Sequence, residues 1–180
     1  PELVSGVSSA SDEYLPMLSP DNEMLFYTRK RDDAAPGDIK SKIVETFSLS
    51  LRDDISMPFD GGSALPKPFN VDPNFGGSTI SIDNKEIIIC ACKDETVRAR
   101  LYRNCDLYSA RYDKYKDPDS GKDRYKWGEL VNLGPTINTN DGWEAQPSLS
   151  ADGRTLYYAT SREDSRGMDI YSANRKADGT

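Results

Sequence analysis

Three stretches of the sequence align without gaps and determine the expected fold: Ser19-Pro-Asp-Asn-Glu-Met-Leu-Phe-Tyr27, Ser81-Ile-Asp-Asn-Lys-Glu-Ile-Ile-Ile89 and Ser150-Ala-Asp-Gly-Arg-Thr-Leu-Tyr-Tyr158. Each carries Ser-x-Asp followed by Asn or Gly, and then an apolar run. Asn and Gly adopt a positive φ at little cost, so Asp-Asn and Asp-Gly are typical of two-residue hairpin turns. Each stretch therefore predicts a strand, a tight turn and a second strand.

A second marker precedes each of these hairpins with one constant spacing: Leu3-x-x-x-Val7-Ser8, Leu65-x-x-x-Phe69-Asn70 and Leu133-x-x-x-Ile137-Asn138. Leu3 and Leu65 are 62 residues apart, and so are Asp21 and Asp83. Leu65 and Leu133 are 68 residues apart, against 69 for Asp83 and Asp152. Two independent markers thus give one period, which indicates an internal repeat.

Two further segments complete each repeat. A third strand with a central aromatic residue is predicted at Glu45-Thr-Phe-Ser-Leu49, Asp106-Leu-Tyr-Ser-Ala110 and Asp169-Ile-Tyr-Ser-Ala173. The leucine-bearing segment supplies a fourth strand, most clearly in Trp127-Gly-Glu-Leu-Val-Asn-Leu133. Four short strands per repeat are typical of a β-propeller blade.

The apolar runs of the second strands agree with this interpretation, because inner propeller strands are covered on both faces and need not alternate. A β-sandwich tolerates such runs but not the triple periodicity. The predicted fold is an all-β, WD40-like propeller with four-stranded antiparallel blades. One domain over 1–180 would hold blade 1 at about 9–70, blade 2 at about 71–138 and an incomplete blade 3 at about 139–180.

The two ends of the sequence predict an arc cut from a larger ring. Pro1–Val7 is expected to be the last strand of a preceding blade, and the sequence stops after a third strand. Three blades do not close a ring, since propellers have four to eight. An alternative is that two copies associate edge to edge, because open blade edges pair readily.

Composition excludes several functions. The 30 acidic and 23 basic residues give a net charge of −7, which argues against nucleic-acid binding. No apolar run approaches the length of a membrane helix, so no direct membrane insertion is expected. The sequence contains no His, which removes Ser-His-Asp and Cys-His catalysis and most zinc or copper sites. We therefore expect no enzyme activity and no catalytic, cofactor-binding or metal-binding residues.

The three Cys residues make a disulfide framework improbable. Cys90 and Cys92 alternate along one strand face and are interpreted as buried apolar side chains. Cys92 and Cys105 could instead lie across a hairpin and pair.

The repeated carboxylates have structural interpretations. Turn position explains Asp21, Asp83 and Asp152, whereas Asp106 and Asp169 are expected to cap a backbone turn at the start of a third strand. Glu45 stands at the corresponding position of the first repeat. The segment Asp117-Pro-Asp119-Ser-Gly121-Lys-Asp123 has the alternating oxygens of a calcium loop, but not the Gly and Glu positions of an EF-hand. A polar hairpin loop is the preferred interpretation there.

Long segments that differ between the repeats are candidate partner surfaces, because propeller blades hold variable loops rigidly. These segments are Arg29–Lys42, Arg52–Pro68, Lys93–Arg103 and Arg111–Lys126. The basic, Tyr-rich stretch Arg111-Tyr-Asp-Lys-Tyr-Lys116 is the preferred contact region, with a solvated hairpin tip as the alternative.

The segment from Trp127 to Tyr171 resembles a known repeat. It contains Asn132-Leu-Gly-Pro-Thr-Ile-Asn-Thr139, Pro147-Ser-Leu-Ser-Ala-Asp-Gly153 and Gly167-Met-Asp-Ile-Tyr171, and so resembles the PD40 repeat, a WD40-like, TolB-related propeller repeat. The variant is similar to that of OmpA-family envelope proteins of Bacteroidota. Pro16-Met-Leu-Ser-Pro-Asp21 also matches, whereas Ser78 and Asn84 depart from the expected Pro and Gly.

The resemblance implies a non-catalytic, protein-binding scaffold in the periplasm, associated with the outer membrane. The implied partners are envelope proteins such as components of the type IX secretion machinery. Peptidoglycan would be bound only through an OmpA-like domain that this sequence does not contain. The alternative function is an accessory propeller that gates a prolyl-oligopeptidase-like peptidase, whose α/β-hydrolase motif is also missing here.

Overall fold

The fold is taken from a computed structural model that describes residues 1–32, 43–71, 74–97, 100–140 and 142–177. These residues form strands and turns and no helix, so none of them forms a helix that could span a membrane. The strands are β1 (Glu13–Leu18), β2 (Met24–Asp32), β3 (Ile43–Leu51), β4 (Ser63–Ala64), β5 (Asn74–Ile80), β6 (Glu86–Val97), β7 (Arg100–Lys116), β8 (Asp123–Trp127), β9 (Val131–Asn132), β10 (Glu144–Leu149), β11 (Thr155–Thr160) and β12 (Asp169–Asn174).

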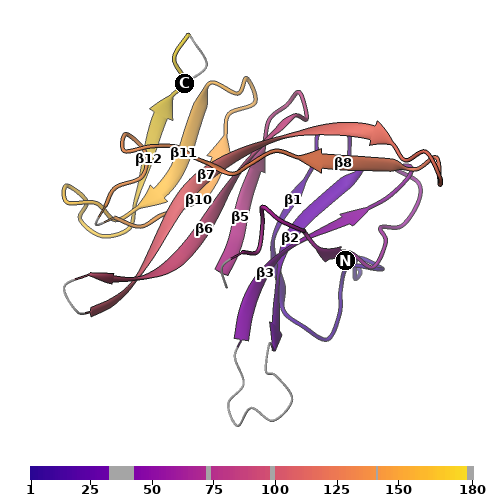
Figure 1. The fold of residues 1–180 in the computed structure, drawn as a ribbon, viewed down its shortest axis with the longest axis horizontal. Coiled ribbons are helices and arrows are strands. Elements are labelled where there is room, and N and C mark those ends of the chain that lie inside the picture. Colours follow the sequence, from indigo (N-terminus) through magenta and orange to yellow (C-terminus); the bar gives the residue numbers. More distant parts are fainter. Residues whose placement is uncertain (33–42, 72–73, 98–99, 141, 178–180) are drawn as a thin grey trace.

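The strands form three antiparallel units that lie side by side in chain order (Figure 1). The first unit is β1-β2-β3-β4, the second is β5-β6-β7-β9 and the third is β10-β11-β12. The hairpin strand β8 extends the second unit from the far half of β7. One parallel pair, Glu45 with Asn74, joins the first two units into a single sheet. The protein is therefore all-β and propeller-like, with one unit per sequence repeat.

The Ser-x-Asp motif closes the turn between the first two strands of every unit. In the second unit the Ser81 N–H donates to the Glu86 carbonyl at 2.9 Å, and the Ser81 hydroxyl oxygen accepts from the Glu86 N–H at 3.0 Å. The same bonds join Ser19 to Met24 and Ser150 to Thr155. The positive φ falls on Asn22, Asn84 and Gly153. The loop thus has four residues rather than the predicted two, because the Ser side chain takes a place in the closing bonds.

A β-bulge interrupts the first strand of every unit at the same repeat position. Leu15, Gly77 and Gln146 have φ of 53°, 66° and 53°, and the register shifts at each of them. Pro16 and Pro147 directly follow two of these residues, and a bulge tolerates Pro because the local ladder is already broken. The Pro of the repeat is therefore a bulge residue.

The core lies between neighbouring units, as continuous apolar second strands require. Phe26 of β2 and Ile88 of β6 are buried at equivalent positions, which confirms that both faces of these two strands are covered. In β11 the prediction is wrong, because the equivalent Tyr157 is 48% exposed. Nothing within the described residues covers that face of the third unit.

The third-strand marker is correct for two units and is displaced by one residue in the first. Ile89 pairs with Tyr108 and Tyr158 pairs with Tyr171, whereas the equivalent Tyr27 pairs with Ser48. Phe47 therefore corresponds to Leu107 and Ile170 rather than to the two tyrosines. The sequence alignment matched Phe47 with Tyr108 and Tyr171 because all three are aromatic. The strand register instead places Phe47 on the opposite face of its strand from the two tyrosines.

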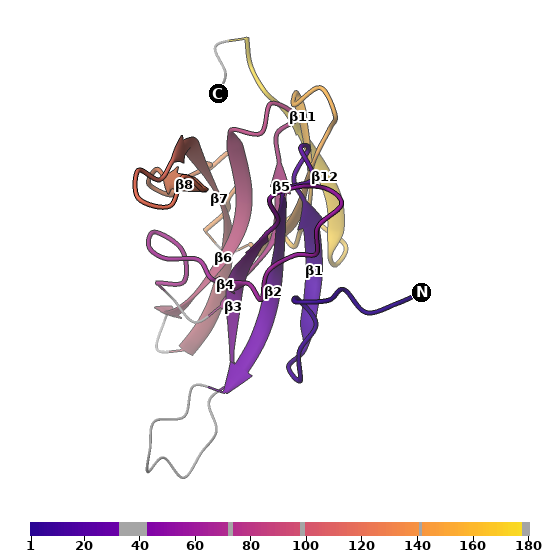
Figure 2. The same cartoon turned by 90° about the vertical axis from the view of Figure 1, so that its right-hand side faces the viewer.

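Two segments expected to be loops are mostly strand, and one segment expected to be a strand is not. Lys93–Arg103 and Arg111–Lys126 are mostly strand, because β6, β7 and β8 continue well beyond the blade-like part of the sheet. Residues 33–42 of the segment Arg29–Lys42 lie outside the described residues. Pro1–Val7 contains a turn and no strand, and Figure 2 shows this N-terminal segment running away from the strands.

Candidate binding surface and cysteine cluster

The repeated aspartates are turn residues, as predicted. The Ser19, Ser81 and Ser150 hydroxyls donate to the carboxylates two residues later at 2.5–2.6 Å. These hydrogen bonds lower the pKa values of Asp83 and Asp152. The carboxylates also accept from the backbone N–H of residues 23, 85 and 154, so the turns occupy them.

The second carboxylate set is not one equivalent site. Asp169 accepts from the Arg166 N–H at 2.8 Å and caps a backbone turn, as predicted. Asp106 lies inside β7 and accepts from the Asn132 amide at 3.0 Å, so its predicted capping role is wrong. Glu45 accepts a hydrogen bond from the Tyr14 hydroxyl.

The segment from Asp117 to Asp123 is a hairpin tip between β7 and β8. Asp117 accepts from the Ser120 N–H and hydroxyl at 2.7 and 2.8 Å, and these bonds lower its pKa. Asp123 forms ion pairs with Lys114 and Lys116. The two carboxylates stabilise the hairpin itself, which supports the polar-loop interpretation over a calcium loop.

The preferred contact region, Arg111–Lys116, is a strand that packs against the first unit. Tyr112 is buried, and the Trp127 ring opposite it packs edge-on against Phe26 and Phe69 with centroids 5.9 and 5.1 Å apart. Lys114 forms an ion pair with Glu23 of the first unit. Figure 1 shows β7 and β8 extending together towards the first unit. One face of the hairpin is therefore an intramolecular clamp, which sequence reasoning missed.

An asparagine at the same repeat position secures the outer edge of each of the first two units. Asn70 accepts from the Phe47 N–H and donates to the Phe47 carbonyl, both at 2.8 Å. Asn138 makes the same two bonds, also at 2.8 Å, with Leu107. This contact explains the Asn of the second sequence marker. It supplies an acceptor for the N–H of Phe47 and of Leu107, while their carbonyls also accept from the Leu65 N–H at 3.0 Å and the Leu133 N–H at 3.1 Å.

The third unit lacks this cover. The outer edge of β12 has no strand partner among the described residues. Ile170 is 80% exposed, whereas its counterparts Phe47 and Leu107 are 1% and 0% exposed. Tyr157 and Met168 are also about half exposed. We call these three residues, Tyr157, Met168 and Ile170, the outer face of the third unit.

A groove of about 330 Å³ lies between the second and third units. Its walls include the apolar side chains of Ile88, Ile137 and Leu156. At its rim Arg175 forms an ion pair of 2.9 Å with Glu86. The groove has an apolar floor, and the Arg154 side chain also lines it.

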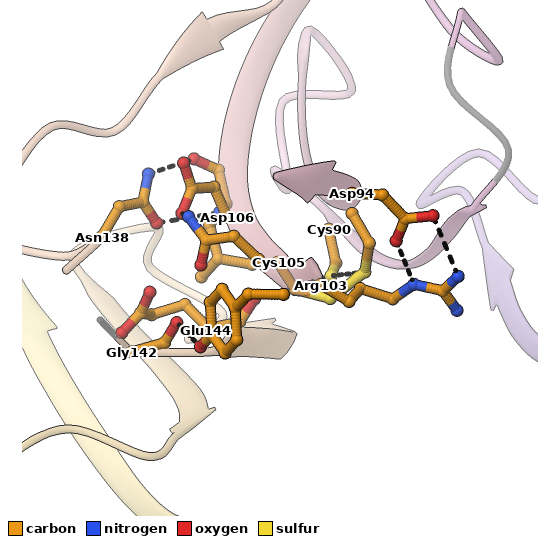
Figure 3. Close-up of a disulfide and its surroundings, with 12 residues drawn as sticks. Cys90, Asp94, Arg103, Cys105, Asp106, Asn138, Gly142 and Glu144 are labelled. Carbon is orange, nitrogen blue, oxygen red and sulfur yellow. Dashed lines mark hydrogen bonds and ion pairs between the residues drawn. A yellow bond between two sulfur atoms is a disulfide. The ribbon is translucent and has the colours of Figure 1, made fainter. Parts of the chain in front are cut away.

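Cys90, Cys92 and Cys105 form a cluster on β6 and β7. Figure 3 shows the disulfide of this cluster, with Cys90 and Cys105 labelled. Cys92 and Cys105 form a disulfide, so the alternative pairing is present and the interpretation of Cys92 as a buried apolar side chain is wrong. Cys90 is a buried free thiol whose Sγ lies 4.0 Å from that of Cys92. Burial raises the pKa of the Cys90 thiol to about 12, so it is protonated at neutral pH.

The surroundings of the cluster join the second unit to the third. The Cys90 thiol lies 3.5 Å from the Glu144 carbonyl oxygen and donates to it. The Tyr102 hydroxyl donates to the Gly142 carbonyl at 2.9 Å. The Glu144 carboxylate is fully buried and accepts from the hydroxyls of Thr139 and Thr160, both at 2.8 Å. Glu144 is a structural residue that no sequence marker had singled out.

Comparisons with known proteins provide no assignment of family. No family model and no curated protein matches the chain. Two similar solved structures are a Trypanosoma rangeli sialidase in complex with the inhibitor DANA and a mutant of that sialidase displaying trans-sialidase activity. Their identities are 12% and 10%, and their TM-scores are 0.42 and 0.44. The match covers 91% of this chain but only 31% of each sialidase chain, and it supports no conclusion about activity.

Proposed function

We propose that this chain is a non-catalytic, protein-binding scaffold module, built from three PD40-type propeller blades. The parent protein would be periplasmic and associated with the outer membrane, and would dock components of type IX secretion or envelope assembly. The observation that carries the proposal is the outer face of the third unit. The PD40-like residues between Trp127 and Tyr171 support the assignment to this lineage.

The exposure of Ile170 and Tyr157 occurs at positions that are core elsewhere. Their counterparts in the first two units are buried against the following unit or the β7–β8 hairpin. Burying an apolar side chain of this size contributes about 1.5–3 kcal/mol. Binding of a partner protein that covers this face with an apolar β-surface would therefore be favourable.

The edge of β12 adds backbone hydrogen-bonding groups to the same surface. The free backbone groups of an edge strand can pair with an added strand, which is a recurring mode of peptide recognition. In the first two units this edge is paired by β4 and β9. The proposed partner thus supplies both a strand and apolar side chains.

Two other observations support the non-catalytic, extracytoplasmic assignment. The turns occupy the repeated carboxylates of Asp21, Asp83 and Asp152, which leaves them structural. The disulfide between Cys92 and Cys105 is of the kind that persists in oxidising compartments.

A site-specific photo-crosslinking experiment in cells tests the proposal. A benzophenone amino acid replaces Ile170 or Tyr157 in the full-length protein, and a matched control places it at the exposed hairpin residue Asp119. We expect adducts with envelope or secretion proteins from the first two positions and none from the control. Adducts of equal yield from all three positions, or no adduct from the outer face, would refute the proposal.

A further inference from the structure

The three cysteine sulfurs converge on one point of the β6–β7 hairpin. All three Sγ atoms lie within 4.8 Å of one another, and no carboxylate oxygen belongs to this group among the described residues. Cys90 and Cys92 lie two residues apart on β6 with their sulfurs 4.0 Å apart, while Cys105 is directly opposite Cys92 on β7. The cluster is thus a set of three soft donors from two paired strands.

The backbone holds these donors in place independently of the disulfide. The pairing of β6 with β7 runs without a register shift from Glu86 and Arg111 to Val97 and Arg100. It continues on both sides of the pair formed by Cys92 and Cys105. Cleavage of the sulfur–sulfur bond therefore frees side-chain rotation but leaves the three Cα positions fixed by the ladder.

We propose that reduction of the disulfide between Cys92 and Cys105 converts the cluster into a three-thiolate site for copper(I). A dithiol reductant supplies two electrons and two protons and becomes a disulfide, while Cys92 and Cys105 become thiols. Binding of one copper(I) ion then forms three metal–sulfur bonds and releases three protons, one each from Cys90, Cys92 and Cys105. The oxidised cluster retains only one thiol and does not bind.

The dimensions of the cluster fit this chemistry. Metal–thiolate bonds of about 2.3 Å place neighbouring sulfurs about 3.8–4.0 Å apart around a shared ion. The Sγ atoms of Cys90 and Cys92 are already 4.0 Å apart. The third donor, Cys105, reaches this separation once the covalent bond is broken.

The donor set favours a soft monovalent cation over zinc. Thiolates select copper(I) and zinc among biological cations. Structural zinc sites take four ligands, whereas copper(I) is satisfied by three sulfurs. The sequence has no His to supply a fourth ligand. Cys90 and Cys105 are buried, which disfavours a water as the fourth ligand, while the partly exposed Cys92 gives the ion access.

An anaerobic copper transfer experiment tests the proposal on the whole chain. The protein is reduced with a dithiol, desalted and titrated into the coloured copper(I)–bicinchoninate complex. We expect one equivalent of copper(I) to move to the reduced protein and none to the oxidised protein. The Cys90→Ser variant keeps the disulfide pair, and after reduction we expect its affinity to be at least tenfold lower.

Two further measurements separate a formed site from loose thiols. Circular dichroism establishes that the reduced protein and Cys90→Ser retain their strands, and X-ray absorption counts the sulfurs around the copper. Three sulfurs in the wild type and two in Cys90→Ser are expected. No transfer to the folded reduced protein, equal affinity of the two proteins, or preferential uptake of zinc would overturn the proposal. Copper bound only by an unfolded reduced chain would overturn it as well.

Discussion

The side-chain amide of Asn138 makes two hydrogen bonds of 2.8 Å with the backbone of Leu107, one to its N–H and one to its carbonyl oxygen. A third bond of 2.8 Å runs from the same amide to Asn132. A single buried side chain thus satisfies both backbone groups of a core residue at the outer edge of the sheet. Asn70 repeats this contact one unit earlier, on Phe47.

Replacement of this asparagine should destabilise the protein strongly. Asn138→Ala removes the acceptor of the Leu107 N–H, whereas the Leu107 carbonyl still accepts from the Leu133 N–H at 3.1 Å. The expected cost is about 1–3 kcal/mol in the free energy of unfolding. Urea denaturation measures this loss. The exposed Asn140→Ala is the matched control, expected to change stability by no more than about 0.5 kcal/mol. Equal stability of the two variants would show that the clamp contributes nothing.

The clamp between the β7–β8 hairpin and the first unit should depend on Trp127. Its ring packs against Phe26, Phe69 and Tyr112. Trp127→Ala should cost about 3 kcal/mol, which urea denaturation detects. Tyr115→Ala, on the exposed side of the same hairpin, should have little effect. If the hairpin were a free loop, the two variants would be indistinguishable.

Equivalent core positions should respond differently in the second and third units. Leu107→Ala removes a fully buried side chain and should cost about 2–5 kcal/mol. Ile170→Ala, at the matching position of β12, should cost less than about 1 kcal/mol because the side chain is 80% exposed. Thermal or urea unfolding of both variants provides the comparison. A similar loss at both positions would mean that Ile170 is covered in solution.

The Ser-x-Asp turns should make stability depend on pH in the acidic range. The Ser81 hydroxyl lowers the pKa of Asp83 in the folded state, so the carboxylate stabilises the fold above its unfolded pKa of about 4. This contribution is lost as the pH falls through the lower folded pKa. NMR titration should show the pKa of Asp83 rising towards its ordinary value in Ser81→Ala. An unchanged pKa in that variant would exclude the hydroxyl as the cause.

Local chemistry accounts for the features that the sequence predicted correctly. The positive φ at Asn22, Asn84 and Gly153 follows from residue type. The burial of β6 was expected from its continuous apolar run. The bulge at Gln146 was not predictable in this way, because neither Leu15 nor Gln146 is a residue type that favours a positive φ. What Leu15 and Gln146 share is their position in the repeat, at the register shift of the first strand, and not a residue type.

Longer-range features needed the strand register. The polar, Tyr-rich composition of Arg111–Lys116 resembles a loop, yet its alternation places Tyr112 and Lys114 on the face that packs against the first unit. The alignment of Phe47 with two tyrosines failed because a one-residue shift moves a strand side chain to the other face. The disulfide between Cys92 and Cys105 was only one possibility until their direct pairing across the hairpin was known.

The three Ser-x-Asp stretches by themselves determined that this protein is a repeat of antiparallel β-units, because turn chemistry and apolar periodicity act over a few residues. Only the tertiary structure decided which side chains of those units remain open. Ile170 and Leu107 have similar side chains and equivalent positions, but one faces solvent and the other faces a neighbouring unit. Burial depends on what packs against a strand, and no local pattern in the sequence encodes that.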